Sequence, residues 1–249
     1  MCIQYDGTLY CGFQRQKNCL TVQGALEESL ERLLGHPVTI RAAGRTDAGV
    51  HAKGQVVAFN TVASIPARRI PMALRGFLPE DIIVDSAEVA PPRFDPVKEA
   101  VDKTYCYRIW RGDSMSVLAR RYVLWHQGNL DYDLMVREAL HFVGKKDFAG
   151  FRARGSTAKT TVRQVFQARL ARKDADGKTD ALWEFWITAD GFLYKMIRLM
   201  VGTLIDVGRG HLPPGTVRAA LEAAGQDEGF RIGECLPGKG LCLEKVRFS

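Results

Sequence analysis

Three side chains that could do chemistry stand close together near residue 47. Arg45, Asp47 and His51 lie in a short polar stretch that also contains Gly44 and Gly49. A carboxylate can act as a nucleophile or a general base, and a guanidinium beside it can bind phosphate. Glycine gives the backbone freedom to turn and to approach other groups closely. The pattern indicates a loop that presents the Asp47 carboxylate for reaction.

The segments on either side of this stretch position it. Residues 38–41 and 55–60 are rich in β-branched side chains and are predicted to be strands. A loop held by two strands is a rigid support for a reactive group. Asp-Ala-Gly is also typical of an ordinary turn, in which the aspartate bonds its own backbone. The stretch is not a phosphate-binding loop, because Val50 and His51 stand where Lys and Ser or Thr are required.

Residues 43–52, Ala-Gly-Arg-Thr-Asp-Ala-Gly-Val-His-Ala, resemble the signature of the TruA family of tRNA pseudouridine synthases. Further matches follow in the order in which the family has them, so the resemblance covers nearly the whole chain. They are residues 5–8, 12–16, 21–23, 103–107, 147–148, 191–193, 196–198, 201–204 and 240–241.

The resemblance implies a reaction that needs no metal and no organic cofactor. The N1–C1′ bond of uridine breaks, the base turns, and it rejoins the ribose through C5. Asp47 is the implied nucleophile or base, and Arg198 is the implied guanidinium that keeps this carboxylate ionised in a dry pocket. Tyr105 matches a tyrosine that stacks on the target base. Arg45 matches an arginine that takes the place of the base when it leaves the stack.

The resemblance also places Gln14, Lys103 and His51 among the residues that bind the RNA. The residue types alone allow simpler interpretations. Arg198 could extend from an apolar helix into water, and Tyr105 could be an ordinary sheet tyrosine with a bonded hydroxyl. Arg45 could be a surface charge, and His51 a structural histidine.

The order of elements predicts an α+β fold with two related halves. The first half reads β-α-β-β-α-β and the second reads β-α-β-β-α, one further helix, then β, which is the split β-α-β (ferredoxin-like) order. We expect domains at 1–95 and 96–249, with the proline-rich segment 90–96 as the linker. The resemblance implies that the two antiparallel sheets join around a basic central cleft.

The individual elements follow from hydrophobic periodicity and from cap and turn residues. We expect helices at 21–34, 66–76, 131–143 and 192–207 and after Thr216, and an irregular insertion at 111–128. Asp174 to Gly177 is predicted to be a hairpin turn. The expected strands are 2–5, 38–41, 55–60, 82–84, 104–110, 161–171, 182–188 and 241–248.

Composition narrows the class of protein. The chain has 249 residues, of which 46% are hydrophobic, and 35 Lys and Arg against 28 Asp and Glu give a formal charge of +7. A basic protein favours a polyanionic partner, and clusters such as Arg68, Arg69 and Arg75 would bind phosphates. No apolar run approaches the roughly 18 residues of a membrane span, and no signal-peptide pattern is present. We therefore expect a cytoplasmic protein that does not interact with membranes.

The cysteines show neither CxxC spacing nor a neighbouring histidine pair. We expect no metal site and six reduced thiols, as is usual in a cytosolic protein. They are Cys2, Cys11, Cys19, Cys106, Cys235 and Cys242.

The resemblance implies a tRNA pseudouridine synthase that modifies positions 38, 39 and 40. The partners implied by the resemblance are the anticodon stem-loop and elbow of tRNA, and a second copy of the chain in a homodimer. Attack of Asp47 on C1′, attack on C6 and removal of a C2′ proton all stay open as mechanisms. The rival hypotheses are an RNA-binding protein without activity and a hydrolase that uses Asp47 with another acid.

Overall fold

The computed structural model describes residues 1–174, 181–223 and 232–249. It forms two compact units. Unit 1 comprises Met1–Lys103 together with Cys242–Ser249, and unit 2 comprises Thr104–Leu241. The units differ from the expected halves in two respects: the boundary lies after Lys103 and not after residue 95, and the end of the chain belongs to the first unit. The α+β class predicted from the sequence is confirmed by the helices and antiparallel strands of both units.

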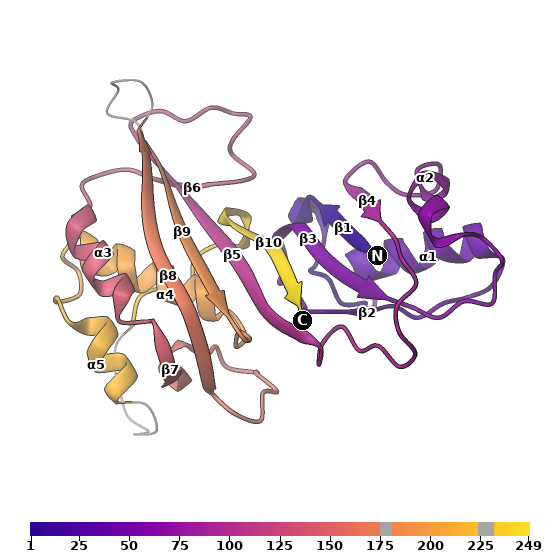
Figure 1. The fold of residues 1–249 in the computed structure, drawn as a ribbon. Helices are drawn as coiled ribbons and strands as arrows, with labels where there is room; N and C mark the ends of the chain where they lie inside the picture. Colours follow the sequence, from indigo (N-terminus) through magenta and orange to yellow (C-terminus); the bar gives the residue numbers. More distant parts are fainter. Residues whose placement is uncertain (175–180, 224–231) are drawn as a thin grey trace. The chain divides into compact units, whose positions relative to one another are not determined.

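Unit 1 is built on a sheet with the strand order β4-β1-β3-β10 (Figure 1). β1 runs antiparallel to both β3 and β4, whereas β10 runs parallel to β3. A short strand, β2, pairs with the far end of β3. The elements of unit 1 are β1 (Cys2–Tyr5), α1 (Val22–Leu34), β2 (Arg41–Ala42), β3 (His51–Ala58), α2 (Ile70–Leu74), β4 (Ile82–Ser86) and β10 (Leu241–Phe248).

The first helix forms where the sequence predicts it. Thr21 caps its start by accepting a bond of 3.2 Å from the backbone N–H of Gly24, and Gly35 ends it in the left-handed region at φ 75°. Leu26 and Leu30 lie on its buried face and are fully covered. Helix α1 packs against α2, which in turn packs on β4.

The strand expected at 82–84 extends to Ser86, and three other predicted elements of unit 1 differ more. The strand expected at 38–41 is only β2, and the strand expected at 55–60 begins earlier, at His51. The helix expected over 66–76 is a 3-10 turn, Ala67–Arg69, followed by the short α2. Pro71 has no N–H to continue a helix that starts at Pro66, which explains the break.

Unit 2 has the strand order β5-β9-β8-β7, with β6 parallel to β5. Its three helices lie together on one side of these strands (Figure 1). The elements are β5 (Ala100–Arg111, whose first four residues belong to unit 1), β6 (Leu124–His126), α3 (Tyr132–Leu140), β7 (Gly144–Asp147), β8 (Val162–Asp174), β9 (Ala181–Ala189), α4 (Met196–Gly208) and α5 (Thr216–Glu222).

Unit 2 has two strands that were not expected, and several of its elements have different ends; for example, β5 begins at Ala100 and not at residue 104, and α3 ends at Leu140 and not at residue 143. β7 was not predicted, and β6 lies inside the segment expected to be irregular. The helix expected from residue 192 begins at Met196, because Lys195 adopts a left-handed backbone conformation at φ 59° that a helix cannot include. The predicted turn at 174–177 falls largely outside the described residues.

The expectation of six reduced thiols is wrong for two of them. Cys11 and Cys19 form a disulfide that closes a small hairpin. The backbone brings them together, since the N–H of Cys11 donates to the carbonyl of Leu20 and Asn18 turns the chain at φ 59°. A spacing of eight residues carries no local signal of this turn, which explains the missed pair.

The helices that the structure describes include none long and apolar enough to cross a membrane.

Candidate active site

Backbone hydrogen bonds fix the loop that carries Asp47. The carbonyl of Thr46 accepts from the N–H of Phe13 at 3.0 Å, and the carbonyl of Asp47 accepts from the N–H of Val50 at 3.1 Å. Beyond the aspartate, the N–H of Gly49 donates to the carbonyl of Tyr10 at 3.3 Å. The backbone is therefore held on both sides of the carboxylate, and the side chain is presented from a rigid support.

Gly12 lies directly against this loop. A Cβ at this position would be 2.8 Å from the carbonyl oxygen of Thr46 and 3.2 Å from the carbonyl carbon of Asp47. Its φ of +100° is also one that other residues rarely adopt. The position therefore requires glycine both for its conformation and for its closeness to the Asp47 backbone.

The base of the loop is bonded from β3, and a buried lysine of β5 lies beside it. The side-chain amide of Gln55 donates to the carbonyl of Gly44 at 2.8 Å. Lys103 is buried, and its side chain runs beside Gly44, where a Cβ would lie 3.4 Å from the lysine Cε. The role of Lys103 in RNA binding stays a prediction.

The other predicted side chains of unit 1 differ in exposure. Asp47 is half-buried, whereas Arg45 and Gln14 are exposed. Arg45 has no ion-pair partner among the residues that the structure describes, so its guanidinium is available to an anion. A half-buried carboxylate beside an exposed guanidinium can receive a phosphate-bearing substrate.

His51 is buried, with 6% of its surface exposed. Its Nδ1 accepts from the N–H of Gly7 at 3.1 Å and lies 3.1 Å from Oδ1 of Asp6. These contacts join the start of β3 to the turn after β1. They show a structural use of His51, and its role in RNA binding stays a prediction.

In unit 2, Tyr105 is a buried residue of β5, with 6% of its surface exposed. Its ring meets Phe192 edge to face, with centroids 5.1 Å apart and planes at 81°. An aromatic pair of this kind fixes the orientation of the tyrosine ring. Phe192 is part of the matched 191–193 segment, but its contact with Tyr105 was not predicted, because the two residues are far apart in the sequence.

Arg198 is the half-exposed residue in the otherwise buried first half of α4. Its Nε donates to the carbonyl of Leu236 at 2.5 Å. Its charge also acts on Tyr107, whose pKa is raised by burial and lowered in part by this guanidinium. Arg198 is therefore held by the protein and does not simply extend into water.

The expected site residues divide between the two units. The set Arg45, Asp47, His51, Gln14 and Lys103 belongs to unit 1, where the residues surround one loop. Tyr105 and Arg198 belong to unit 2. Sequence reasoning missed Tyr5, whose hydroxyl bonds the side chain of Thr46, and Leu236, because neither is near its partner in the sequence.

The Asp47 loop of unit 1 presents a half-buried carboxylate and, two residues earlier in the sequence, the exposed guanidinium of Arg45. In the described part of the chain, no group of three or more His, Cys, Asp or Glu is arranged to hold a metal ion. Asp47 can supply a nucleophile or a base, and Arg45 can supply positive charge for phosphate.

Comparison with known proteins identifies the family. A family model described as tRNA pseudouridine synthase matches residues 1–96 and 139–249. The chain belongs to the tRNA pseudouridine synthase family. The resemblance found in residues 43–52 is thereby confirmed. The match contains Asp47 and Arg198, while Lys103 and Tyr105 lie in the segment 97–138 that the model leaves out.

Curated members of the tRNA pseudouridine synthase family align over nearly the whole chain. "tRNA pseudouridine synthase A" of Geobacter sulfurreducens is 44% identical over 247 residues, which cover 99% of this chain and 97% of the relative. The proteins of the same name from Geotalea daltonii and Pelobacter propionicus are 42% and 43% identical. These alignments cover 98% and 99% of this chain, and 96% and 97% of the relatives.

Among solved structures, the chain aligns with part of a crystal structure of a Cbf5-Nop10-Gar1 complex. The alignment covers 98% of this chain and 48% of that chain, at 12% identity and a TM-score of 0.36. This likeness is too low to support an argument about the fold.

Proposed function

We propose that this chain isomerises uridine to pseudouridine at positions 38, 39 and 40 of the tRNA anticodon stem-loop, with Asp47 as nucleophile or base. Membership of the family supports the more general statement that the chain is an isomerase that acts on tRNA uridines. The observation that supports the residue assignment is the Asp47 loop, whose backbone is bonded on both sides of a half-buried carboxylate.

The proposed reaction balances without a cofactor. The N1–C1′ bond breaks, a C5–C1′ bond forms, the proton at C5 is lost and N1 gains a proton. Asp47 either attacks C1′ or C6, or removes the C2′ proton. The target base must first leave its stack, which costs a few kcal/mol. Arg45, exposed beside Asp47, offsets this cost by taking the place of the base or binding its phosphate.

In this proposal Arg198 and Tyr105 act on the same uridine as Asp47. The guanidinium of Arg198 keeps the Asp47 carboxylate ionised, and the ring of Tyr105 stacks on the freed base. Gln14, Lys103 and His51 bind the RNA around them. The related ferredoxin-like halves, the basic cleft, the homodimer and the cytoplasmic location stay predictions.

The first test uses an unmodified tRNA transcript whose uridines carry tritium at C5. Isomerisation releases this tritium into water, which gives a rate, and carbodiimide labelling with primer extension maps the product. We expect product at positions 38, 39 and 40. Asp47→Asn should lower kcat by roughly 10²–10⁴-fold, the range for a lost general acid or base.

Asp113→Asn is the matched control, because Asp113 is exposed and has no bonding partner among the described residues. It should react like the unchanged protein. Tight, salt-sensitive tRNA binding without tritium release would favour an RNA-binding protein. Full activity of Asp47→Asn would overturn the residue assignment.

The second test concerns the two residues of unit 2. Arg198→Gln should lower kcat strongly, whereas Arg218→Gln, which removes an exposed arginine paired with Glu222, should not. Tyr105→Phe keeps the stacking ring and should retain most activity, whereas Tyr105→Leu should lose it. If Tyr105→Leu retains activity, stacking by Tyr105 is excluded.

A further inference from the structure

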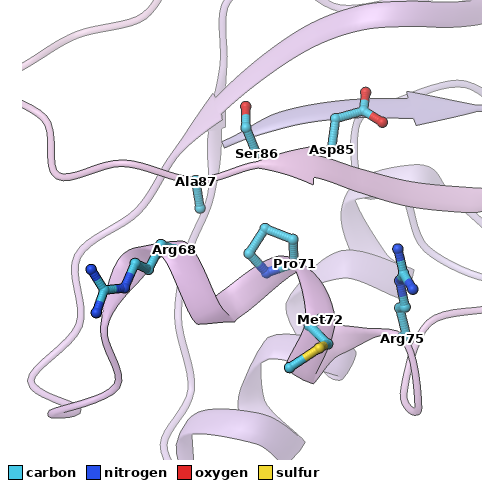
Figure 2. Close-up of a pocket in the computed structure, with 7 residues that line it drawn as sticks. All are labelled: Arg68, Pro71, Met72, Arg75, Asp85, Ser86 and Ala87. Carbon is cyan, nitrogen blue, oxygen red and sulfur yellow. The ribbon is translucent and has the colours of Figure 1, made fainter.

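A groove on unit 1 lies between the short helix α2 and the end of β4. It has a volume of about 300 Å³. One wall is formed by Arg68, Pro71, Met72 and Arg75, and the other by residues 85–87 (Figure 2). The pyrrolidine of Pro71 and the exposed side chain of Met72 lie between the two arginines, so the groove has an apolar middle and a cation toward each end.

The two arginines carry charge that the described residues do not neutralise. Arg68 and Arg75 are exposed and have no ion-pair partner within the described part of the chain, and the same is true of the neighbouring Arg69. Asp85 is the one acidic residue of the lining. Both of its carboxylate oxygens accept from the side-chain amide of Gln4 at 2.9 Å. The groove is therefore net positive.

The groove is separate from the Asp47 loop. Ser86 of β4 pairs with Cys2 of β1, and Cys2 pairs on its other side with Val56 of β3. His51, which follows the Asp47 loop, is five residues back along β3 and two strands away from β4. At about 3.3 Å per residue and 4.8 Å per strand, the two places are roughly 20 Å apart.

We propose that this groove is a second RNA-contact site, which binds backbone phosphates of tRNA at a distance from the target uridine. The inference rests on the proposed function, since it takes tRNA as the substrate. Arg68 and Arg75 bind phosphate oxygens, for which the planar guanidinium is well suited. The exposed Met72 and Pro71 lie against the sugar between them. The arginines on either side of α2 thus hold the body of the tRNA while the Asp47 loop acts on one nucleotide.

Counterion release gives a direct test. Each phosphate contact contributes about 0.7 to 0.9 to the slope of log binding constant against log salt concentration. The double variant Arg68→Gln/Arg75→Gln should therefore lower the slope for full-length tRNA by roughly 1.4 to 1.8. Arg68→Lys/Arg75→Lys keeps both charges and should retain most of the slope.

The matched control removes the same two charges elsewhere. Lys98→Gln/Arg218→Gln should leave the slope unchanged, since Lys98 and Arg218 are exposed residues away from the groove. The proposal places the contact on the part of the tRNA beyond the anticodon stem-loop, so an isolated stem-loop should bind the double arginine variant as it binds the unchanged protein. Tritium release at saturating tRNA should also be unchanged, which separates this proposal from the proposed reaction.

Two results would overturn the proposal. One is an unchanged salt slope for full-length tRNA in Arg68→Gln/Arg75→Gln. The other is an equal loss of binding for full-length tRNA and for the isolated stem-loop, which would place the effect at the target site.

Discussion

The hydroxyl of Tyr5 lies 2.8 Å from Oγ1 of Thr46, the residue that precedes Asp47. Both side chains are buried, and burial raises the pKa of Tyr5 despite this bond, so the hydroxyl stays neutral. The first strand of the fold is thereby bonded to the loop that carries the proposed catalytic residue.

Tyr5→Phe should lower the free energy of unfolding by about 1 to 3 kcal/mol, because it leaves Oγ1 of Thr46 buried without this partner. Thr46→Val should have a similar effect. The double variant should cost less than the sum of the two, since both remove one bond. Urea denaturation of all four proteins measures this coupling. Strictly additive losses would show that the bond contributes nothing.

Gly12 and Gly35 provide a matched pair of substitutions. Both have positive φ, but a Cβ at Gly35 meets no atom within 4 Å, whereas at Gly12 it would lie 2.8 Å from the Thr46 carbonyl oxygen. Gly35→Ala should cost about 1 kcal/mol of stability and leave kcat unchanged. Gly12→Ala should also displace the Asp47 loop and lower kcat by about 10²-fold. Equal kcat values for the two variants would show that this close approach does not position Asp47.

The Cys11–Cys19 disulfide can be tested by counting the free thiols of the protein. Of the six cysteines, two are bonded, so four thiols should titrate with Ellman's reagent in denaturant without reductant. Closing a loop of this size stabilises a protein by about 2.5 kcal/mol in the chain-entropy model. Cys11→Ser/Cys19→Ser should lose this amount, and reductant should destabilise the unchanged protein but not the variant. Cys235→Ser, at an exposed cysteine outside the disulfide, is the control. Six titrating thiols would contradict the pairing.

Glu184 of β9 predicts a dependence of stability on pH. Burial raises the pKa of its carboxyl. Hydrogen bonds from Lys173 and Trp186, together with the charges of Lys173 and Arg108, lower this pKa by more than burial raises it, so the pKa lies below its ordinary value of 4.5. Because the folded pKa is lowered, the stabilisation is present above the unfolded value and is lost as pH falls through the folded value.

Glu184→Gln should therefore cost about 2 kcal/mol at pH 7, the size of a hydrogen bond to a charged group. The difference from the unchanged protein should shrink as the pH falls below 4.5, the ordinary value of the carboxyl. Denaturant midpoints from pH 3 to pH 7 measure it. A constant difference over this range would exclude an ionised Glu184 as the cause.

Local signals predicted part of this fold well. Helix α1 has its cap at Thr21 and its stop at Gly35 in adjacent sequence, so its bounds follow from short-range chemistry. Strand β7 was missed because Gly-Lys-Lys-Asp has no alternation of apolar residues, and β8 alone makes it a strand. Lys195 shows the same limit, since nothing in its sequence requires the left-handed conformation that delays α4.

The sequence motifs identified the candidate catalytic residues but not the residues that contact them. Asp47 and Arg198 could be named because they stand in matched segments. Their neighbours could not, because Tyr5 and Leu236 reach Thr46 and Arg198 through tertiary packing between segments 41 and 38 residues apart. Contacts at such separations depend on the fold, which hydrophobic periodicity does not specify.

The sheet of unit 1 can be completed only late in synthesis, because its strand β10 comes from the last residues of the described chain. Its residues Cys242 and Leu243 pair with His51 and Ala52, so the strand that follows the Asp47 loop receives its neighbour from the last part of the chain. A ribosome adds about 5 to 20 residues per second, and unit 1 must wait while unit 2 is made. For roughly 7 to 28 seconds the edge of β3 is exposed in the nascent chain. A chain that stops before Leu241 therefore lacks the strand that pairs with β3 beside the Asp47 loop.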